Sequence, residues 1–324
     1  PGDWNRLLKT GSLSAIRNIN YNIIPDNQWF ELKVRVVENT IRIFVNDQPV
    51  VNYTEPELAF RTVEYEKRTL GSGTFRIETL YGNTSLDIKN MDVRRLPGAE
   101  VINTADPVLV KQITMLHIRN FPLADYHVHL KQGLSMEMAL DSSSIYGINY
   151  GIAANCGLKF PIQNDEEMEA YLQSLEGLPV YKAIQAEGRE WVDMFSAELV
   201  AEFDYAFTDA MTWTNKNGVR QRLWIPEETD VGDPEDFMDQ LVDRLVKILS
   251  TEPIDIYVNP TFLPPEIDEM YDELWTEERM DRVITALVDN HVAFELNNRR
   301  RIPSAAFICR AKEAGVKFTL GTND

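Results

Sequence analysis

The sequence predicts two domains of different class, an antiparallel β-domain followed by a parallel α/β barrel. Up to residue 98, short runs of alternating apolar and polar residues are separated by turn residues, which is typical of half-buried antiparallel strands. From residue 123, strand-like runs alternate with helical segments, which is the pattern of a parallel sheet covered by helices. The strand-like runs of this second part also end in polar residues, as expected where barrel strands build a site.

The first domain is expected over residues 1–98 as a series of hairpins. Its expected strands are residues 29–37, 41–45, 50–51, 73–80 and 85–96. Glu38-Asn39 and residues 46–48 form the expected turns between the first three strands. Pro97-Gly98 ends the sheet, and residues 99–122 are expected to form a connector with a short apolar piece.

The second domain is expected over residues 123–324 as a barrel of seven strand–helix units that lacks its last helix. Its expected strands are residues 125–130, 150–156, 180–187, 205–213, 254–259, 292–297 and 317–324. Its expected helices are residues 135–146, 165–175, 191–202, 234–250, 276–290 and 303–314. Ser135, Asn164 and Thr276 are the expected helix N-caps, and Gly147, Gly177 and Gly315 the expected helix ends.

The composition limits the possible ligands. Lys and Arg total 32 against 51 Asp and Glu, a net charge of −19, which disfavours nucleic acid and anionic membranes as partners. Such a charge favours a neutral or cationic small molecule, or a bound cation. No stretch has the length and hydrophobicity of a membrane span. Two cysteines, Cys156 and Cys309, make no disulfide framework.

The run Ala124-Asp-Tyr-His-Val-His-Leu130 carries the strongest chemical signal. On a strand, His127 and His129 project from the same face. Neutral imidazole is a common metal ligand, and the chain has only 4 histidines. We interpret the pair as a metal or catalytic site at the barrel mouth. The alternative is one hydrogen-bonded core histidine and one histidine that faces solvent.

The polar residues at the strand ends form a candidate site as a set. They are His127, His129, Asn155, Cys156, Glu187, Glu190, Asp209, Trp213, Asn259, Glu295, Asn297, Asn323 and Asp324. One polar residue at a strand end is common, but the whole series predicts a shared pocket. Several carboxylates in one pocket would require a cation, or some of them would be protonated or turned outward.

The first domain resembles the concanavalin-like, laminin-G-like sandwich of the 3-keto-disaccharide hydrolase family. The matching features are Gln28-Trp29 at the start of a strand, residues 41–47, and residues 86–93. They correspond to the later part of that domain, so either strands precede Pro1 in the natural protein or this version is reduced. Residues 1–98 present no cluster of titratable groups, so we expect sugar binding or packing from this domain rather than catalysis.

Residues 124–324 resemble the polymerase and histidinol phosphatase (PHP) domain, a distorted seven-stranded barrel similar to amidohydrolases. Members bind up to three divalent metals and hydrolyse phosphoesters with a metal-activated water. The resemblance assigns His127, His129 and Glu187 as metal ligands, with Asp324 or Asp209 as the further ligand. Asn155 and Asn259 stand where the family has histidines, and the chain stops before a final histidine. We therefore expect at most one divalent ion, Zn²⁺ or Mn²⁺, with a metal-free pocket as the alternative.

The remaining polar residues receive expected roles. Glu190 or Asp209 is the expected general base. Arg189 and the run Asn298-Arg-Arg-Arg301 are candidates to hold an anionic or polyhydroxylated substrate, with an ion-paired loop as the alternative for the run. The candidate substrate-binding residues are Asn155, Arg189, Trp213, Asn259, Glu295, Asn297, Arg299 and Asn323. Trp191, Trp213 and Trp224 either stack on sugar rings or pack in the core.

These assignments predict a metal-dependent hydrolase or lyase that acts on a carbohydrate-derived or phosphorylated small molecule, with a sugar-binding sandwich. The alternative is a non-catalytic carbohydrate-binding protein with a degenerate PHP-like barrel. The sequence leaves the oligomeric state open, and only the family resemblance favours a periplasmic or secreted location.

Overall fold

The computed structural model describes residues 8–71, 73, 77, 86–96, 106–131, 133–215 and 217–323. The chain divides into two compact units, Pro1–Leu123 with Asp141–Gly147, and Ala124–Leu140 with Ile148–Asp324. The domain bounds drawn from the sequence, with a connector at 99–122, stay a proposal that limited proteolysis can test. No helix among the described residues is long and apolar enough to cross a membrane.

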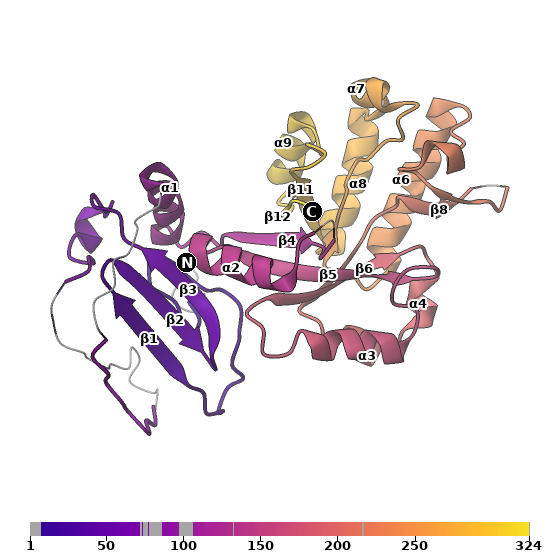
Figure 1. Ribbon diagram of the computed structural model, residues 1–324. Helices are drawn as coiled ribbons and strands as arrows, with labels where there is room; N and C mark the ends of the chain where they lie inside the picture. Colours follow the sequence, from indigo (N-terminus) through magenta and orange to yellow (C-terminus); the bar gives the residue numbers. More distant parts are fainter. Residues whose placement is uncertain are drawn as a thin grey trace. The chain divides into compact units, whose positions relative to one another are not determined.

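The first unit contains a three-stranded antiparallel meander of β1 (Leu32–Val37), β2 (Thr40–Val45) and β3 (Gln48–Thr54). The register pairs Val37 with Thr40 and Val45 with Gln48, so both connections are tight (Figure 1). Glu38, Asn46 and Asp47 hold positive φ angles of 50°, 48° and 63° in these turns. The expected hairpins over the first three strands are therefore present.

The later strands of the expected sandwich are not seen in the part of the chain that the structure describes. Residues 86–96 form no strand, and Gly73 and Ile77, the only described residues of the expected strand 73–80, lie outside strands as well. Local alternation and a family resemblance predicted these strands, but a strand also requires a neighbouring strand to complete its backbone hydrogen bonds. The rest of residues 73–80, and Ser85, lie outside the described residues.

The expected connector contains helix α1 (Pro107–Ile118), which follows a short 3-10 turn, η2 (Val63–Tyr65), in the first unit. The Asp106 side chain caps α1 by accepting hydrogen bonds from the backbone N–H groups of Val108 and Leu109, and Pro107 occupies the first turn. The short apolar piece expected within the connector therefore lies on this helix.

The second unit contains a parallel seven-stranded sheet that nearly closes into a barrel. Its order is β12-β11-β10-β7-β6-β5-β4. The strands are β4 (Ala124–Val128), β5 (Asn149–Gly157), β6 (Tyr181–Glu187), β7 (Tyr205–Thr208), β10 (Ile256–Tyr257), β11 (Ala293–Asn297) and β12 (Phe318–Gly321). The two end strands meet where the Asn323 N–H donates to the His127 carbonyl at 2.9 Å. All seven expected strands are present, and the parallel barrel prediction is confirmed.

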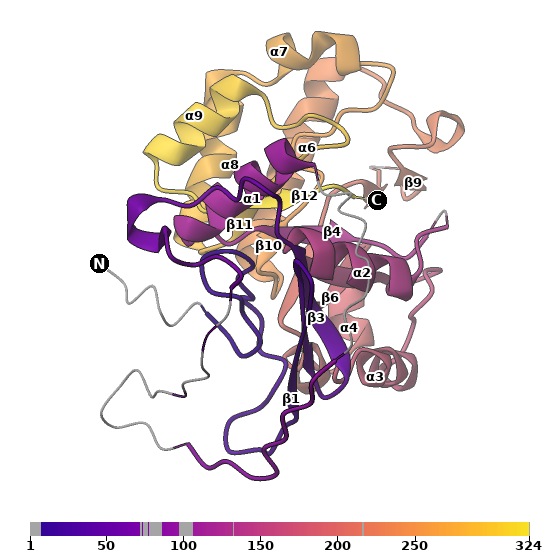
Figure 2. The ribbon, with the colours of Figure 1, turned by 60° about the vertical axis from the view of Figure 1, so that its left-hand side comes forward.

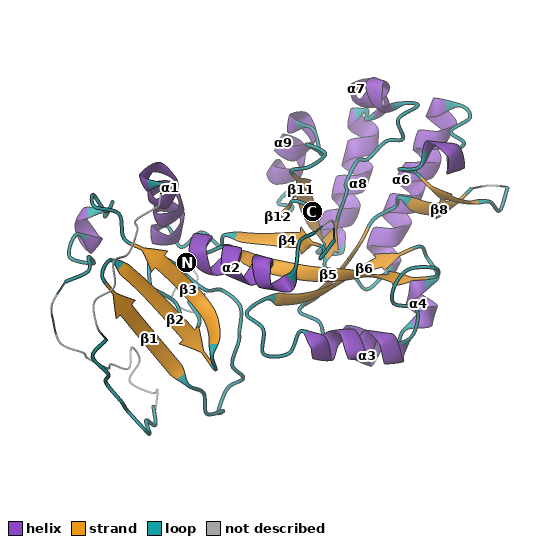
Figure 3. Ribbon diagram, viewed as in Figure 1, coloured by secondary structure: helices purple, strands orange, loops and turns teal. Residues whose placement is uncertain are grey.

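Helices cover the outside of this sheet. They are α2 (Met136–Tyr146), α3 (Asp165–Ser174), α4 (Trp191–Met194), α5 (Ala197–Val200), α6 (Pro234–Thr251), α7 (Tyr271–Leu274), α8 (Glu277–Asp289) and α9 (Ala305–Glu313), with 3-10 turns η3 (Pro226–Glu228) and η4 (Asp268–Met270). α8 packs between α6 and α9, while α3 lies beside β5 and β6 on the other side of the strands (Figures 1 and 3). Asn164 and Thr276 cap α3 and α8 as expected.

Two expected elements are divided. The helix expected at 191–202 forms as α4 and α5, because Phe195 takes an extended conformation and is buried. The strand expected at 205–213 ends at Thr208. The chain then forms a separate hairpin of β8 (Thr212–Thr214) and β9 (Arg220–Arg222).

Aromatic side chains fill part of the barrel interior. Tyr205 stacks on Phe207 at 6.0 Å between ring centroids and meets the Tyr126 ring edge-on at 5.6 Å. The Tyr205 hydroxyl donates to the Tyr126 carbonyl, and Gly151 leaves the space that this hydroxyl occupies. The interior is therefore a packed core, and chemistry is confined to the carboxyl ends of the strands. Figure 2 shows the strands in a second view.

Candidate active site

The two histidines of β4 converge at the carboxyl end of the barrel. Their Nε2 atoms are 3.2 Å apart, and both side chains are buried. Residues two apart on a strand share a face, so β4 directs both imidazoles to one point. The His127 Nε2 also lies 3.2 Å from the Oε1 atom of Gln185 on β6.

Each imidazole is oriented through its other nitrogen. The His129 Nδ1 lies 2.9 Å from the Ala153 carbonyl oxygen, which can only accept, so Nδ1 carries the proton. The His127 Nδ1 lies 2.6 Å from Oε1 of Glu295 and donates to that carboxylate. Burial, with the charges of His127 and Lys131, lowers the pKa of His129 to about 3. With each Nδ1 bonded to a fixed oxygen, the two Nε2 atoms face one another at a shared position.

Glu295 on β11 is fixed by three donors. Besides the His127 ring, its carboxylate accepts the Asn259 backbone N–H at 2.7 Å and the Asn297 side-chain amide at 2.9 Å. The side chain is 1% exposed, so these bonds replace water entirely. A carboxylate on the Nδ1 of an imidazole sets the tautomer and raises the basicity of Nε2.

Glu187 and Asp209 are the other buried acids of the site. Glu187 accepts hydrogen bonds from Asn155 Nδ2 at 2.8 Å and from the Thr212 hydroxyl at 3.0 Å. Asp209 accepts from Asn259 Nδ2 at 2.8 Å and from Gln185 Nε2 at 3.4 Å. Burial, followed by the charge of Asp209, raises the pKa of Glu187 to about 8, and burial also raises the pKa of Asp209.

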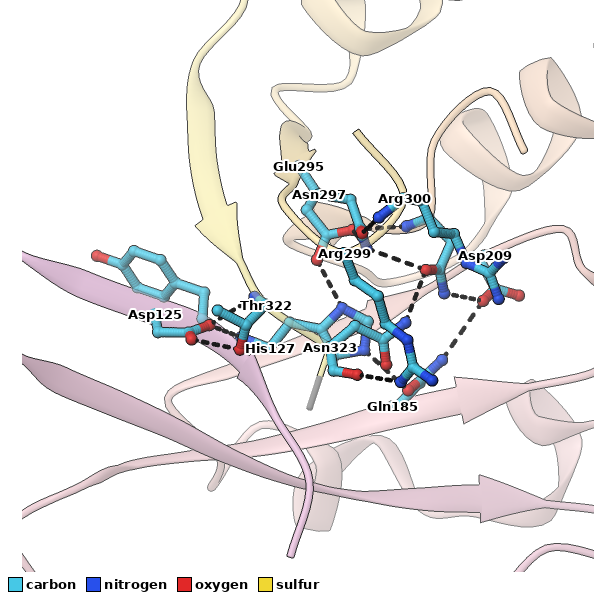
Figure 4. Close-up of polar contacts among 12 residues, drawn as sticks. Asp125, His127, Gln185, Asp209, Glu295, Asn297, Arg299, Arg300, Thr322 and Asn323 are labelled. Carbon is cyan, nitrogen blue, oxygen red and sulfur yellow. Dashed lines mark hydrogen bonds and ion pairs between the residues drawn. The ribbon is translucent and has the colours of Figure 1, made fainter. Parts of the chain in front are cut away.

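Asparagine amides connect the strand ends into a network (Figure 4). The Asn259 Oδ1 accepts from the Asn297 amide at 3.1 Å and from the Asn323 amide at 2.9 Å. Asn259 and Asn323 hold positive φ angles of 46° and 56°, and Thr261 one of 60°. Non-glycine residues in this conformation concentrate at functional sites, where the surrounding contacts hold them in place.

Other candidate residues point elsewhere. Arg189 donates to Glu252, to the Thr208 hydroxyl and to the Asp209 carbonyl, so its guanidinium is held within the protein. The Trp213 ring is 2% exposed and donates to Gln221, and the Glu190 carboxylate pairs with Arg220 outside the buried network. Trp191 is buried and donates to Glu252. Cys156 is buried, and Asp324 lies outside the described residues.

Several contributors were not identified from the sequence. Gln185 lies two residues before Glu187 on β6, and Asp125 lies two before His127 on β4, so strand alternation could have placed both near the site. Asp125 accepts from the Thr322 hydroxyl at 2.6 Å and links β4 to the end of β12. Thr212 lies on β8 of the β8–β9 hairpin, and the sequence analysis did not predict this hairpin.

The two Nε2 atoms have the spacing of two ligands of one metal ion. Two imidazole ligands about 2.05 Å from a tetrahedral ion would lie about 3.3 Å apart, close to the observed Nε2 separation of 3.2 Å. The carboxylates of Glu187 and Asp209 are held by amides and a hydroxyl instead. No group of three or more His, Cys, Asp or Glu residues suited to a metal occurs among the described residues. The next available donor is the neutral Gln185 carbonyl.

Comparisons with known proteins find both resemblances that the sequence predicts. Residues 3–94 match the family model of the 3-keto-alpha-glucoside-1,2-lyase-like domain. A solved histidinol phosphate phosphatase from Lactococcus lactis subsp. lactis, complexed with zinc, L-histidinol and phosphate, is similar at 13% identity and a TM-score of 0.43. That match covers 62% of this chain and 86% of the phosphatase chain. The search of curated proteins found no match.

Replacing Gly321 by alanine should disrupt the contact between Glu295 and His127. An added Cβ would lie 2.1 Å from Glu295 Oε1 and 2.8 Å from His127 Cβ. We expect Glu295 to leave His127, with a loss of about 1–3 kcal/mol in the free energy of unfolding measured by urea titration. Gly71→Ala is the control, since its Cβ would meet no atom within 4 Å. Unchanged stability and an unchanged His127 imidazole NMR signal would contradict the packing described.

Proposed function

We propose that the barrel is a hydrolase that binds one divalent ion through His127 and His129 and acts on a carbohydrate-derived substrate. The observation that carries the proposal is the 3.2 Å approach of the two Nε2 atoms, each with its Nδ1 bonded to a fixed oxygen. Neutral imidazoles with converging lone pairs repel one another unless a cation or a proton lies between them. Zn²⁺ and Mn²⁺ both accept imidazole ligands.

The bound ion would supply Lewis acidity and a water of lowered pKa. The chain would supply the proton transfers. Glu187, with its pKa raised to about 8, holds a proton at neutral pH and is the proposed donor to a leaving-group oxygen. Asp209 is the proposed proton acceptor. Glu190 is a weaker candidate than Asp209, because its carboxylate is paired with Arg220 at 2.8 Å.

The carbohydrate class is supported by the first domain. The family that matches residues 3–94 is named for activity on keto-glucosides. A second candidate function, non-catalytic carbohydrate binding, is favoured by one observation: the amides of Asn155, Asn259 and Asn297 satisfy carboxylates that a metal cluster would otherwise bind.

Metal titration of the purified chain tests the proposal. We expect one Zn²⁺ or Mn²⁺ per chain by isothermal calorimetry after chelator treatment, and no binding by the His127→Ala/His129→Ala double variant. His291→Asn is the matched control, because His291 is an exposed histidine in the same unit with a φ of 59°, a conformation that asparagine tolerates. Two or three tightly bound ions would contradict the single-ion site.

An activity assay separates the two candidate functions. The metal-loaded chain is expected to release p-nitrophenol from a p-nitrophenyl glycoside or phosphate, and the double histidine variant is not. A chain that binds sugar but releases no p-nitrophenol in any metal state would favour the binding protein.

A further inference from the structure

The loop between β11 and α9 carries three consecutive arginines, residues 299–301. An ion-paired loop is the simplest explanation for such a run in a chain of net charge −19. Six other arginines of the barrel unit contact carboxylates: Arg189, Arg220, Arg222, Arg279, Arg282 and Arg310. Arg244 is an exception, since it lies over the Trp213 ring and donates to the Thr214 carbonyl. Among the described residues, no carboxylate lies within ion-pair distance of the three loop arginines.

Backbone hydrogen bonds fix the loop. The Asn297 N–H donates to the Ile302 carbonyl and the Asn298 N–H to the Gly321 carbonyl, both at 2.9 Å. The Arg300 N–H donates to the Asn297 side-chain oxygen, also at 2.9 Å. The loop is therefore tied to β12 and to the amide network of the active site, which reduces the entropy that a ligand would have to remove on binding.

Among the residues that the structure describes, the guanidinium groups of Arg299 and Arg300 have donors without a hydrogen-bond partner. Arg299 uses one nitrogen, Nη1, to bond the Asn323 carbonyl at 3.0 Å. Arg300 lies over the Phe262 ring at 4.4 Å, a contact that uses its face and leaves its N–H groups at the edge. Both residues are exposed, and Figure 4 shows both beside the amide network. Burial lowers the pKa of Arg300, and the charge of Arg299 adds to this effect, while the negative charges of Asp209 and Glu295 oppose it.

We infer that Arg299 and Arg300 form a subsite for an anionic group of the substrate, a carboxylate or a phosphate. The positive charges of Arg299 and Arg300 repel one another, and an oxyanion that accepts hydrogen bonds from both guanidinium groups would relieve this repulsion. The planar forks of arginine fit either group. The reaction at such a substrate rests on the proposed hydrolase function, but the binding of the anion does not.

Calorimetric titration of the metal-free chain in EDTA tests the subsite. The probes are inorganic phosphate, D-glucuronate and, as a neutral sugar, D-glucose. We expect the Arg299→Gln/Arg300→Gln variant to bind at least one of the two anions about tenfold more weakly or worse than the natural chain, with glucose unaffected. The better anion identifies the group. Arg282→Gln, which removes one positive charge from α8, is expected to leave anion affinity unchanged.

Further variants separate this inference from the metal proposal. The double histidine variant is expected to keep anion binding in EDTA, and Arg299→Lys/Arg300→Lys to keep part of it. Equal anion affinity in the natural chain and the Gln variant, or no anion binding by either, would overturn the subsite even if one metal binds at the histidines. Anion binding by a natural chain that binds no metal after metal titration would overturn only the metal proposal.

Discussion

Replacing Gly151 by alanine is expected to cost about 3 kcal/mol or more in the free energy of unfolding, or to prevent the barrel from folding. An added Cβ would lie 1.6 Å from the Tyr205 hydroxyl oxygen and 3.3 Å from the Tyr126 Cα. The Tyr205 ring is 7% exposed and is held between Phe207 and Tyr126, and its hydroxyl donates to the Tyr126 carbonyl at 2.8 Å. Neither the ring nor the strand has space to move aside.

Urea denaturation followed by tryptophan fluorescence measures this effect. Gly71→Ala is the control again, because its Cβ meets open space. The double variant Gly151→Ala/Tyr205→Phe should recover part of the loss, since it removes the oxygen that is nearest the new methyl group. A Gly151→Ala protein as stable as the natural chain would show that the Tyr205 hydroxyl does not occupy this position.

The fold was predictable where the hydrophobic periodicity of a segment agrees with the capping and terminating residues at its ends. Asn164 and Thr276 stand before amphipathic segments, and Gly177 and Gly315, with φ of 70° and 87°, stand after α3 and α9, so those helices form where expected. Residues 86–96 have the same alternation as β2 but no strand in the structure. Alternation describes the side chains only, whereas a strand also depends on a distant backbone partner that a local pattern does not reveal.

The sequence predicted which residues lie at the strand ends better than it predicted where their side chains point. Strand alternation placed His127 with His129, and barrel topology placed both near the end of β11, where Glu295 meets His127. Arg189 and Trp213 also follow strand ends, yet their side chains turn into the protein, because Glu252 and Gln221 offer buried acceptors there. Those acceptors lie on other elements, so their positions follow only from tertiary packing.

Conversion of His117 to asparagine should make the first unit more resistant to acid, by roughly 2 kcal/mol between pH 6.5 and 4.5. The His117 Nδ1 accepts the Asn18 N–H at 3.1 Å, and its buried Nε2 has no partner among the described residues. Burial, with the charge of Arg17, lowers the pKa of His117 from 6.5 to about 3. Below about pH 6.5 the unfolded chain binds a proton at His117, whereas the folded chain binds it only near pH 3. The contribution of His117 to stability is therefore full above pH 6.5 and is lost as the pH falls toward 3.

An asparagine oxygen can accept the same N–H without titrating. Urea denaturation at several pH values, with the exposed His291→Asn as control, measures the difference. Parallel pH profiles for the natural chain and His117→Asn would show that His117 does not carry this acid sensitivity.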